Sequence, residues 1–234
     1  MKRYFVLIFF ILCSSSCAEL QQVSREIASS RNISEQTIAD GLQQALTKGV
    51  EIQVTKLTRE NGFYNNPLVK IGLPKELAEI ESTLRNLGLN NLADEGIKAL
   101  NTTAQKAVNE ATPIFISAIQ QMTFEDSKAI LLGDNTAATT YLKEKTQDEL
   151  YAKFEPVIQD NFEKVGADNI WKTLIEKYNQ VPFTENVNTD LTDYVTSQAL
   201  KGVFKMIEVE EIDIRTNINE RSTQLLRQVF ALQD

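Results

Sequence analysis

The fold class follows most directly from residues 146–166, TQDELYAKFEPVIQDNFEKVG. Apolar side chains recur at steps of three and four residues, which places them on one face of an α-helix: Leu150, Phe154, Val157 or Ile158, Phe162 and Val165. Thr146 and Glu149 have the spacing of a capping box and predict the start of this helix, and Gly166 predicts its end. Pro156 predicts a kink, because proline lacks the N–H group that a helix interior needs.

A second long helix is predicted before it, over residues 34–62, SEQTIADGLQQALTKGVEIQVTKLTRENG. Ser34 is the expected N-cap, and apolar residues follow at helical spacing. Gly41 and Gly49 lower the helix propensity, so we interpret them as places where another helix packs closely. Gly62 is expected to end the helix in the left-handed conformation.

Residues 91–122 combine a helical stripe with an internal proline. Asn91 is the expected N-cap. The stripe stays in phase across Pro113, which predicts one kinked helix rather than two unrelated helices. Its members are Ala104, Val108, Ala111, Phe115, Ala118 and Met122.

Further helices are expected in the remainder of the chain, of which the one from Asp190 is long, whereas strand-like alternation is rare. They are predicted from Pro74 to Leu87 with Gly88 at the end, from a capping box of Thr123 and Asp126 to Leu132, after Thr136, over residues 170–178 before Pro182, from a cap at Asp190 to about Ile214, and after a cap signal at Asn217–Glu220. The sequence therefore predicts an irregular, all-α single domain with kinked helices over residues 33–234.

The first sixteen residues, MKRYFVLIFFILCSSS, have the order of a secretory signal peptide. Lys2 and Arg3 precede a short apolar run and then small residues. The apolar run is about half of the roughly 20 residues that a membrane-spanning helix needs. We therefore predict export and removal of residues 1–16.

Cys17 is the expected site of lipidation, because Ser-Ser-Ser-Cys resembles the lipobox of bacterial lipoproteins. Ser14 departs from that pattern, in which leucine is commonest at this position. Ordinary cleavage at a small-x-small site, which would leave Cys17 as a free thiol, is the alternative. Residues 17–32 are polar and small, and we interpret them as a lipid-anchored tether that reaches roughly 20 Å as a flexible coil.

Composition excludes several kinds of chemistry. The net charge of −8 becomes −10 once Lys2 and Arg3 leave with the signal peptide, so no nucleic-acid partner is expected. The chain has no histidine, and its two cysteines, Cys13 and Cys17, both lie in the export region. The usual general base, zinc ligand and thiol nucleophile are therefore missing, and no metal or cofactor is predicted.

Four short stretches resemble one known family: GFYNNP at 62–67, IQQMTFED at 119–126, AAT at 137–139 and IRTN at 214–217. The family is a group of bacterial exported proteins catalogued as domain of unknown function 4197. The resemblance covers residues 38–231. It implies an all-helical domain behind a signal peptide, and it implies no established activity.

Two segments are candidate binding sites. Phe63, Tyr64, Asn65 and Asn66 lie together in a predicted loop, where amides and aromatic rings could hold a ligand. The alternative is that the two aromatic residues fill the core while the asparagines form a turn.

Arg215 and Asn217 lie between the last two predicted helices. A guanidinium in that position binds either an anionic ligand or the end of a helix. A solvent-open pocket around Arg215 would favour the ligand, and a buried salt bridge would favour a structural role.

Other polar patterns have simpler explanations. The oxygen-bearing residues of Asn186–Asp190 alternate as in a calcium loop, but Leu191 and Ser197 replace the glycine and the closing glutamate that such a loop needs. Glu125 and Asp126 are adjacent, so they do not face each other across a substrate, and the helix dipole favours acids in a first turn.

The sequence thus predicts a cell-envelope lipoprotein that binds or scaffolds rather than catalyses, with an envelope protein or a small apolar ligand as its partner. An apolar ligand would need a cavity lined by aromatic side chains: Phe115, Phe124, Tyr141, Phe154 or Trp171. The alternative is a hydrolase that uses carboxylates without histidine or thiol.

Overall fold

The computed structural model describes residues 34–73, 78–164 and 191–232, together with residues 169, 172, 173, 176, 179 and 180. The predicted signal peptide, Cys17 and the tether lie outside these residues. So do Gly166, Trp171, Asn186–Asp190 and most of the helix predicted over residues 170–178.

Most of the described chain is helical, and none of its described residues forms a β-strand, which confirms the predicted all-α class. The elements are α3 (Glu35–Thr58), α4 (Ala78–Asn86), α5 (Asn90–Ala107), the 3-10 turn η2 (Val108–Glu110), α6 (Ala111–Gln120), α7 (Phe124–Leu132), α8 (Ala137–Lys164), α10 (Thr192–Thr216), the 3-10 turn η3 (Ile218–Glu220) and α11 (Gln224–Phe230).

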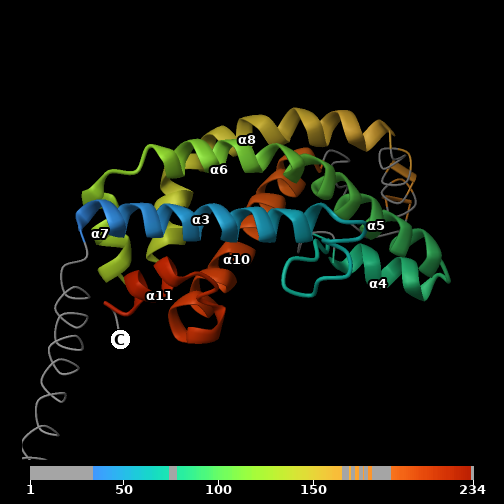
Figure 1. The fold of residues 1–234 in the computed structure, drawn as a ribbon. Helices are drawn as coiled ribbons and strands as arrows, with labels where there is room; N and C mark the ends of the chain where they lie inside the picture. Colours follow the sequence, from blue (N-terminus) through green and yellow to red (C-terminus); the bar gives the residue numbers. More distant parts are fainter. Residues whose placement is uncertain are drawn as a thin grey trace, which may run out of the picture.

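Helix α10 lies at the centre of the arrangement (Figure 1). It contacts α3 on one side and α8 and α5 on the other. Helix α3 also packs against α6, α7 and α11, and α8 also packs against α5 and α6. The fold therefore has three long helices, α3, α8 and α10, with shorter ones closing its ends, as the predicted irregular architecture requires.

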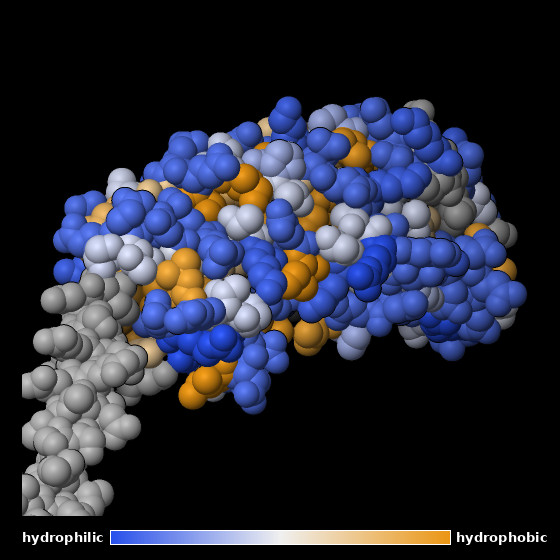
Figure 2. All heavy atoms as spheres, in the orientation of Figure 1, coloured by the Kyte–Doolittle hydropathy of each residue, from blue (hydrophilic) through white to orange (hydrophobic). Residues whose placement is uncertain are grey.

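The core contains the apolar stripes that the sequence predicts. Phe115 of α6 and Phe154 of α8 are both fully buried, and Phe115 meets Phe204 of α10 edge to face with ring centroids 5.8 Å apart. Each such ring contributes about 1.5–3 kcal/mol by leaving water. The surface in Figure 2 is mostly polar with scattered apolar patches. Phe115 and Phe154 are thus core residues, not the lining of an open apolar cavity.

Three predicted helix ends are confirmed. The hydroxyl of Ser34 accepts the N–H of Thr37 at 3.1 Å, and Thr123 and Asp126 form a reciprocal capping box. Gly88 closes α4 with a φ of +79°, a left-handed conformation that glycine adopts without a Cβ penalty.

Four predicted helix starts differ from the structure. Thr146 does not cap a helix but lies buried inside α8, where its hydroxyl donates to the carbonyl of Leu142 at 2.6 Å. Asn91 is the second residue of α5, which begins after Leu89 without a side-chain cap. Asn217 caps only the 3-10 turn η3, and Thr223 caps α11. Likewise α10 begins after Leu191, one residue beyond the predicted cap.

Gly62 is needed for a different reason from the one predicted. Helix α3 ends earlier, at Thr58, and Asn61 takes the left-handed conformation with a φ of 58°. A Cβ atom on Gly62 would lie 2.4 Å from the carbonyl oxygen of Leu57. Gly62 therefore permits a close backbone approach rather than a left-handed turn.

The two internal prolines have different effects. Before Pro113 the α-helix gives way to the 3-10 turn η2, as expected when a proline ring crowds the carbonyl four residues earlier. Pro156 lies inside the continuous helix α8. The close packing predicted at the helix glycines is confirmed, because a Cβ on Gly41 would lie 2.6 Å from Val229 of α11 and one on Gly49 would lie 3.3 Å from Glu210 of α10.

Candidate functional site

Arg215 belongs to a buried ionic network. Its guanidinium pairs with Glu211, one turn earlier on α10, at 2.8 Å, and both side chains are at least nine-tenths buried. The same guanidinium donates to the carbonyls of Ile130 and Leu131 at the end of α7. By the criterion stated for the sequence, Arg215 has a structural role: it ties α10 to the C-terminal end of α7.

Glu211 completes this network on the other side. Its carboxylate accepts the backbone N–H groups of Ala138 and Thr139, and the hydroxyl of Thr139, all at 2.8 Å. These N–H groups belong to the first turn of α8, where the helix dipole favours a negative charge. One ion pair thus holds the α7–α8 corner against α10.

Asn217 is exposed at the end of α10, where its side chain accepts the N–H of Asn219 at 3.1 Å. Close to it, Arg215 and Arg221 both stack on the ring of Phe230, at 5.8 and 5.7 Å from its centroid. Neither Arg215 nor Asn217 lines the groove that is described below.

The loop candidates divide between the two interpretations. Phe63 is fully buried, and Asn66 forms the turn by accepting the N–H of Leu68 at 3.1 Å. Tyr64 is only partly buried, and its ring lies 4.1 Å from the ammonium of Lys70. Asn65 is exposed. The core-filling interpretation is therefore right for Phe63 and not for Tyr64.

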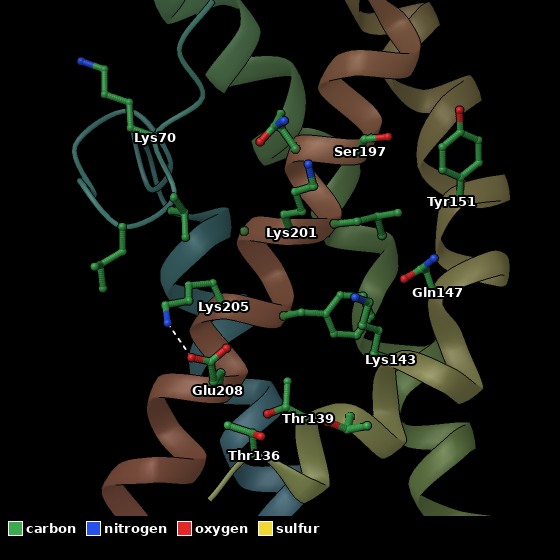
Figure 3. Close-up of a pocket in the computed structure, with 17 residues that line it drawn as sticks. Lys70, Thr136, Thr139, Lys143, Gln147, Tyr151, Ser197, Lys201, Lys205 and Glu208 are labelled. Atoms are coloured by element: carbon green, nitrogen blue, oxygen red, sulfur yellow. Dashed lines mark hydrogen bonds and ion pairs between the residues drawn. The ribbon is translucent and has the colours of Figure 1, made fainter. Parts of the chain in front are cut away.

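A groove with a volume of about 860 Å³ lies between α8 and α10, and most of its lining residues are polar. We call it the lysine groove. Its walls carry hydroxyls, amides and ammonium groups (Figure 3). The lining is Leu68, Val69, Lys70, Thr136, Thr139, Thr140, Lys143, Gln147, Tyr151, Ser197, Gln198, Leu200, Lys201, Gly202, Phe204, Lys205 and Glu208.

Regular helical spacing builds both walls. On α8, Thr140, Lys143, Gln147 and Tyr151 follow one another at steps of three or four residues, so they share one face. On α10, Ser197, Lys201, Lys205 and Glu208 again follow one another at steps of three or four, and Gln198 is next to Ser197. The two stripes line one groove because α8 and α10 pack side by side.

Two of the lysines are uncompensated. Lys205 pairs with Glu208 at 2.5 Å, and Lys70 lies over Tyr64 and extends away from the two helices in Figure 3. Within the residues that the structure describes, the ammonium groups of Lys143 and Lys201 make no hydrogen bond or ion pair. The groove therefore presents two free positive charges in a chain whose net charge is −8.

The floor of the groove is held in place by Gly202. A Cβ there would lie 2.8 Å from the ring of Phe63 and 3.3 Å from Val69, so glycine lets the loop pack directly onto α10. The end of this loop is fixed by the buried Asn101 of α5, which exchanges two hydrogen bonds of 2.8 Å with the backbone of Ile71. The loop that contains the candidate residues Phe63–Asn66 thus packs directly against α10 beside the groove.

Tyr151 closes one end of the groove as a hydrogen-bond donor. Its hydroxyl donates to Asp193 at 2.6 Å, and this bond raises the pKa of Tyr151 to about 12. The phenol therefore stays neutral at all physiological pH values. It adds a polar contact to the groove without adding a charge.

The family model described as protein of unknown function (DUF4197) matches residues 32–231. The chain belongs to this family. Neither the curated proteins nor the solved structures that were searched contain a match. Family membership is consistent with the predicted resemblance, and three of its stretches surround the features described above: 62–67 precedes the groove loop, 137–139 binds Glu211, and 214–217 contains Arg215.

Sequence reasoning missed the groove altogether. The available signal was the repeated spacing of polar residues, Ser197–Lys201–Lys205 on one helix and Thr140–Lys143–Gln147 on another. Such spacing is also typical of any solvated helix face, so the sequence could not show that the two faces meet.

Two further observations concern membrane spans and metal sites in the described residues. No helix within the described ranges is long and apolar enough to cross a membrane. In the same part of the chain, no group of three or more histidine, cysteine, aspartate or glutamate residues is placed to hold a metal ion. What the groove offers is positive charge with neutral hydrogen-bonding groups between the charges, which is suited to binding an anion.

Proposed function

We propose that the protein is an exported, lipid-anchored protein of the cell envelope, and that it binds an anionic ligand in the lysine groove without catalysing a reaction. The observation that carries the binding proposal is the pair of uncompensated ammonium groups, Lys143 of α8 and Lys201 of α10, which line one groove. The leader sequence and the SSSC stretch ending at Cys17 support the anchor.

The charges of the groove make a bound anion favourable. Lys205 is already paired with Glu208, whereas Lys143 and Lys201 have no acidic partner among the described residues. A ligand that carries negative charge gains ion pairs with these two exposed ammonium groups, each contributing about 0.2–1 kcal/mol. An acidic chain that keeps lysines clustered in one groove is therefore consistent with selective binding of anions.

The lining supports binding over hydrolysis. Hydrolysis by carboxylates needs two of them on opposite sides of the scissile bond. Among the described lining residues only Glu208 is acidic, and its carboxylate is already paired with Lys205. A hydrolase therefore finds less support in this site than a binding protein does.

The binding proposal is tested with the full-length chain, exported and processed in a bacterial host and purified in detergent. Short-chain polyphosphate is the probe, and isothermal titration calorimetry at low and high salt is the measurement. The double variant Lys143→Gln/Lys201→Gln should weaken binding by about tenfold or more, and the remaining binding should fall with added salt.

The matched control is Lys98→Gln/Lys153→Gln, which removes the same charge from exposed positions outside the groove lining. It should leave the affinity nearly unchanged. Equal losses in both double variants would show that polyphosphate responds to net charge alone and would refute the groove as a site.

The anchor is tested independently by mass spectrometry of the mature N-terminus. A diacyl- or triacyl-modified Cys17 is expected, together with release from membranes by detergent and not by salt. An unmodified N-terminus at Cys17 or Ala18 would refute lipidation.

A further inference from the structure

We propose that the occupant of the lysine groove is a linear acidic glycan, a chain of sugar units bearing carboxylates, that lies along the groove between α8 and α10. This inference rests on the proposed function and narrows its ligand class. Three properties of the groove support this inference: its length, the order of its polar groups and the helical backbone of its walls, which offers no free hydrogen-bonding groups.

The groove is elongated. On α8 the wall runs from Thr140 to Tyr151, and on α10 it runs from Ser197 to Glu208. At 1.5 Å per residue, each stretch is about 16 Å long. The enclosed volume of about 860 Å³ is near the upper end of the range for small-molecule sites. A single small anion would contact only a short part of these walls, whereas a chain would use both along their length.

The polar groups alternate in a way that suits a sugar acid. Along α10, the hydroxyl of Ser197 precedes the ammonium groups of Lys201 and Lys205, and along α8, Lys143 lies between Thr140 and Gln147. Hydroxyls and amides both donate and accept, as sugar hydroxyls do, while ammonium groups bind carboxylates as point charges without the planar match that arginine demands. The lining includes no arginine among the described residues, so its positive charges are separate point charges along the groove.

The walls suit a peptide less well. Extended peptides bind mainly by adding to an exposed strand edge or by placing apolar anchors in a hydrophobic groove. Here both walls are α-helices, whose backbone groups are bonded within each helix. Of the apolar lining residues, Val69, Leu200 and Phe204 are buried, and Leu68 is exposed. Side chains alone remain to bind the ligand, and most of those exposed are polar.

The test uses the full-length processed chain and oligogalacturonates that range from the monomer to the hexamer. Calorimetric affinity should rise by about tenfold or more over this series and then level off once the groove is filled. The neutral galactose oligomer of the same length should bind at least about tenfold more weakly. Lys143→Gln/Lys201→Gln should abolish the rise with length.

The neutral contacts separate this inference from simple attraction between charges. Gln147→Ala and Ser197→Ala keep the net charge and remove surface groups, so they are not expected to impair folding; circular dichroism checks this. Each should weaken the hexamer by about threefold or more and leave polyphosphate binding unchanged. If both probes weaken equally, or neither does, the glycan assignment is wrong.

The remaining outcomes are equally decisive. If the dissociation constant of the galacturonate monomer, expressed per carboxylate group, equals that of the hexamer, the ligand is not a chain. If an oligoglutamate peptide of matched charge binds more tightly than the hexamer, the occupant is a peptide. If polyphosphate binds and no oligogalacturonate does, the proposed function stands and this inference fails, whereas binding of neither overturns both.

Discussion

Replacing Glu211 with glutamine tests whether the buried ionic network organises the fold. The carboxylate accepts five hydrogen bonds: two from the guanidinium of Arg215, two from the backbone of α8 and one from the hydroxyl of Thr139. An amide has one accepting oxygen in place of two. In either orientation of the new side chain, its NH2 group faces donors.

The expected loss is large. A buried donor left without an acceptor costs about 1–3 kcal/mol, and Arg215 would keep its charge without a partner. Removing one member of a buried ion pair typically costs about 3–5 kcal/mol in total. We therefore expect Glu211→Gln to lower the free energy of unfolding by that amount. This is a large share of the stability of a typical domain.

Urea unfolding followed by circular dichroism measures this loss. With an m value of about 3 kcal/mol/M, the midpoint should fall by about 1 M or more. Glu208→Gln is the matched control on the same helix, because it breaks an exposed pair with Lys205 and should cost less than about 1 kcal/mol. The double variant Glu211→Gln/Arg215→Met should lose less than the sum of its single changes. Similar losses for Glu211→Gln and Glu208→Gln would refute the argument.

Three further predictions concern separate features. Gly62→Ala should cost about 1–3 kcal/mol in urea unfolding because its Cβ would lie 2.4 Å from a carbonyl oxygen, whereas Gly72→Ala, with nothing within 4 Å, should be neutral or stabilise by up to about 1 kcal/mol. The hydrogen bond from the N–H of Thr123 lowers the pKa of Asp126. The stability that Asp126 contributes is therefore present above about pH 4 and is lost as the pH falls through the lowered pKa. The difference in unfolding free energy between the wild type and Asp126→Asn should shrink in acid, and a difference that does not change with pH would contradict this. Glu208→Gln frees Lys205 from its ion pair and should tighten polyphosphate binding several-fold in calorimetry. Unchanged or weaker binding would show that Lys205 does not contact the ligand.

Local rules predicted the helices well and their starts less well. Periodicity identified the long helices because the same buried face recurs within a few residues of sequence. Capping signals succeeded at Ser34 and Thr123, where the hydroxyl faces the first turn. At Thr146 the same pattern lies inside a helix, because the stretch before it, from Ala137, is also helical and packs on the core. A capping box and a buried threonine bonded to its own helix look alike in sequence.

The site depended on contacts that sequence spacing does not reveal. The sequence offers Arg215 two kinds of partner, an anionic ligand or the end of a helix. Its carboxylate partner is on the same helix, and its carbonyl partners, Ile130 and Leu131, are more than 80 residues away in sequence. Glu211 was not singled out at all. An acid on a helix gives no sign that the N-terminus of another helix will pack onto it.

The two clusters of charge in this molecule illustrate one physical rule. Glu211 and Arg215 are buried, so each must be satisfied by the protein itself, and they bond to each other and to the backbone of α7 and α8. Lys143 and Lys201 are exposed, so water can solvate them and the fold need not supply partners. Buried charged groups in this protein stabilise the fold, whereas exposed charged groups in the lysine groove are available to bind an external anion. Arg215 therefore has a structural role, while Lys143 and Lys201 on the adjacent helices α8 and α10 are the better candidates for a binding function.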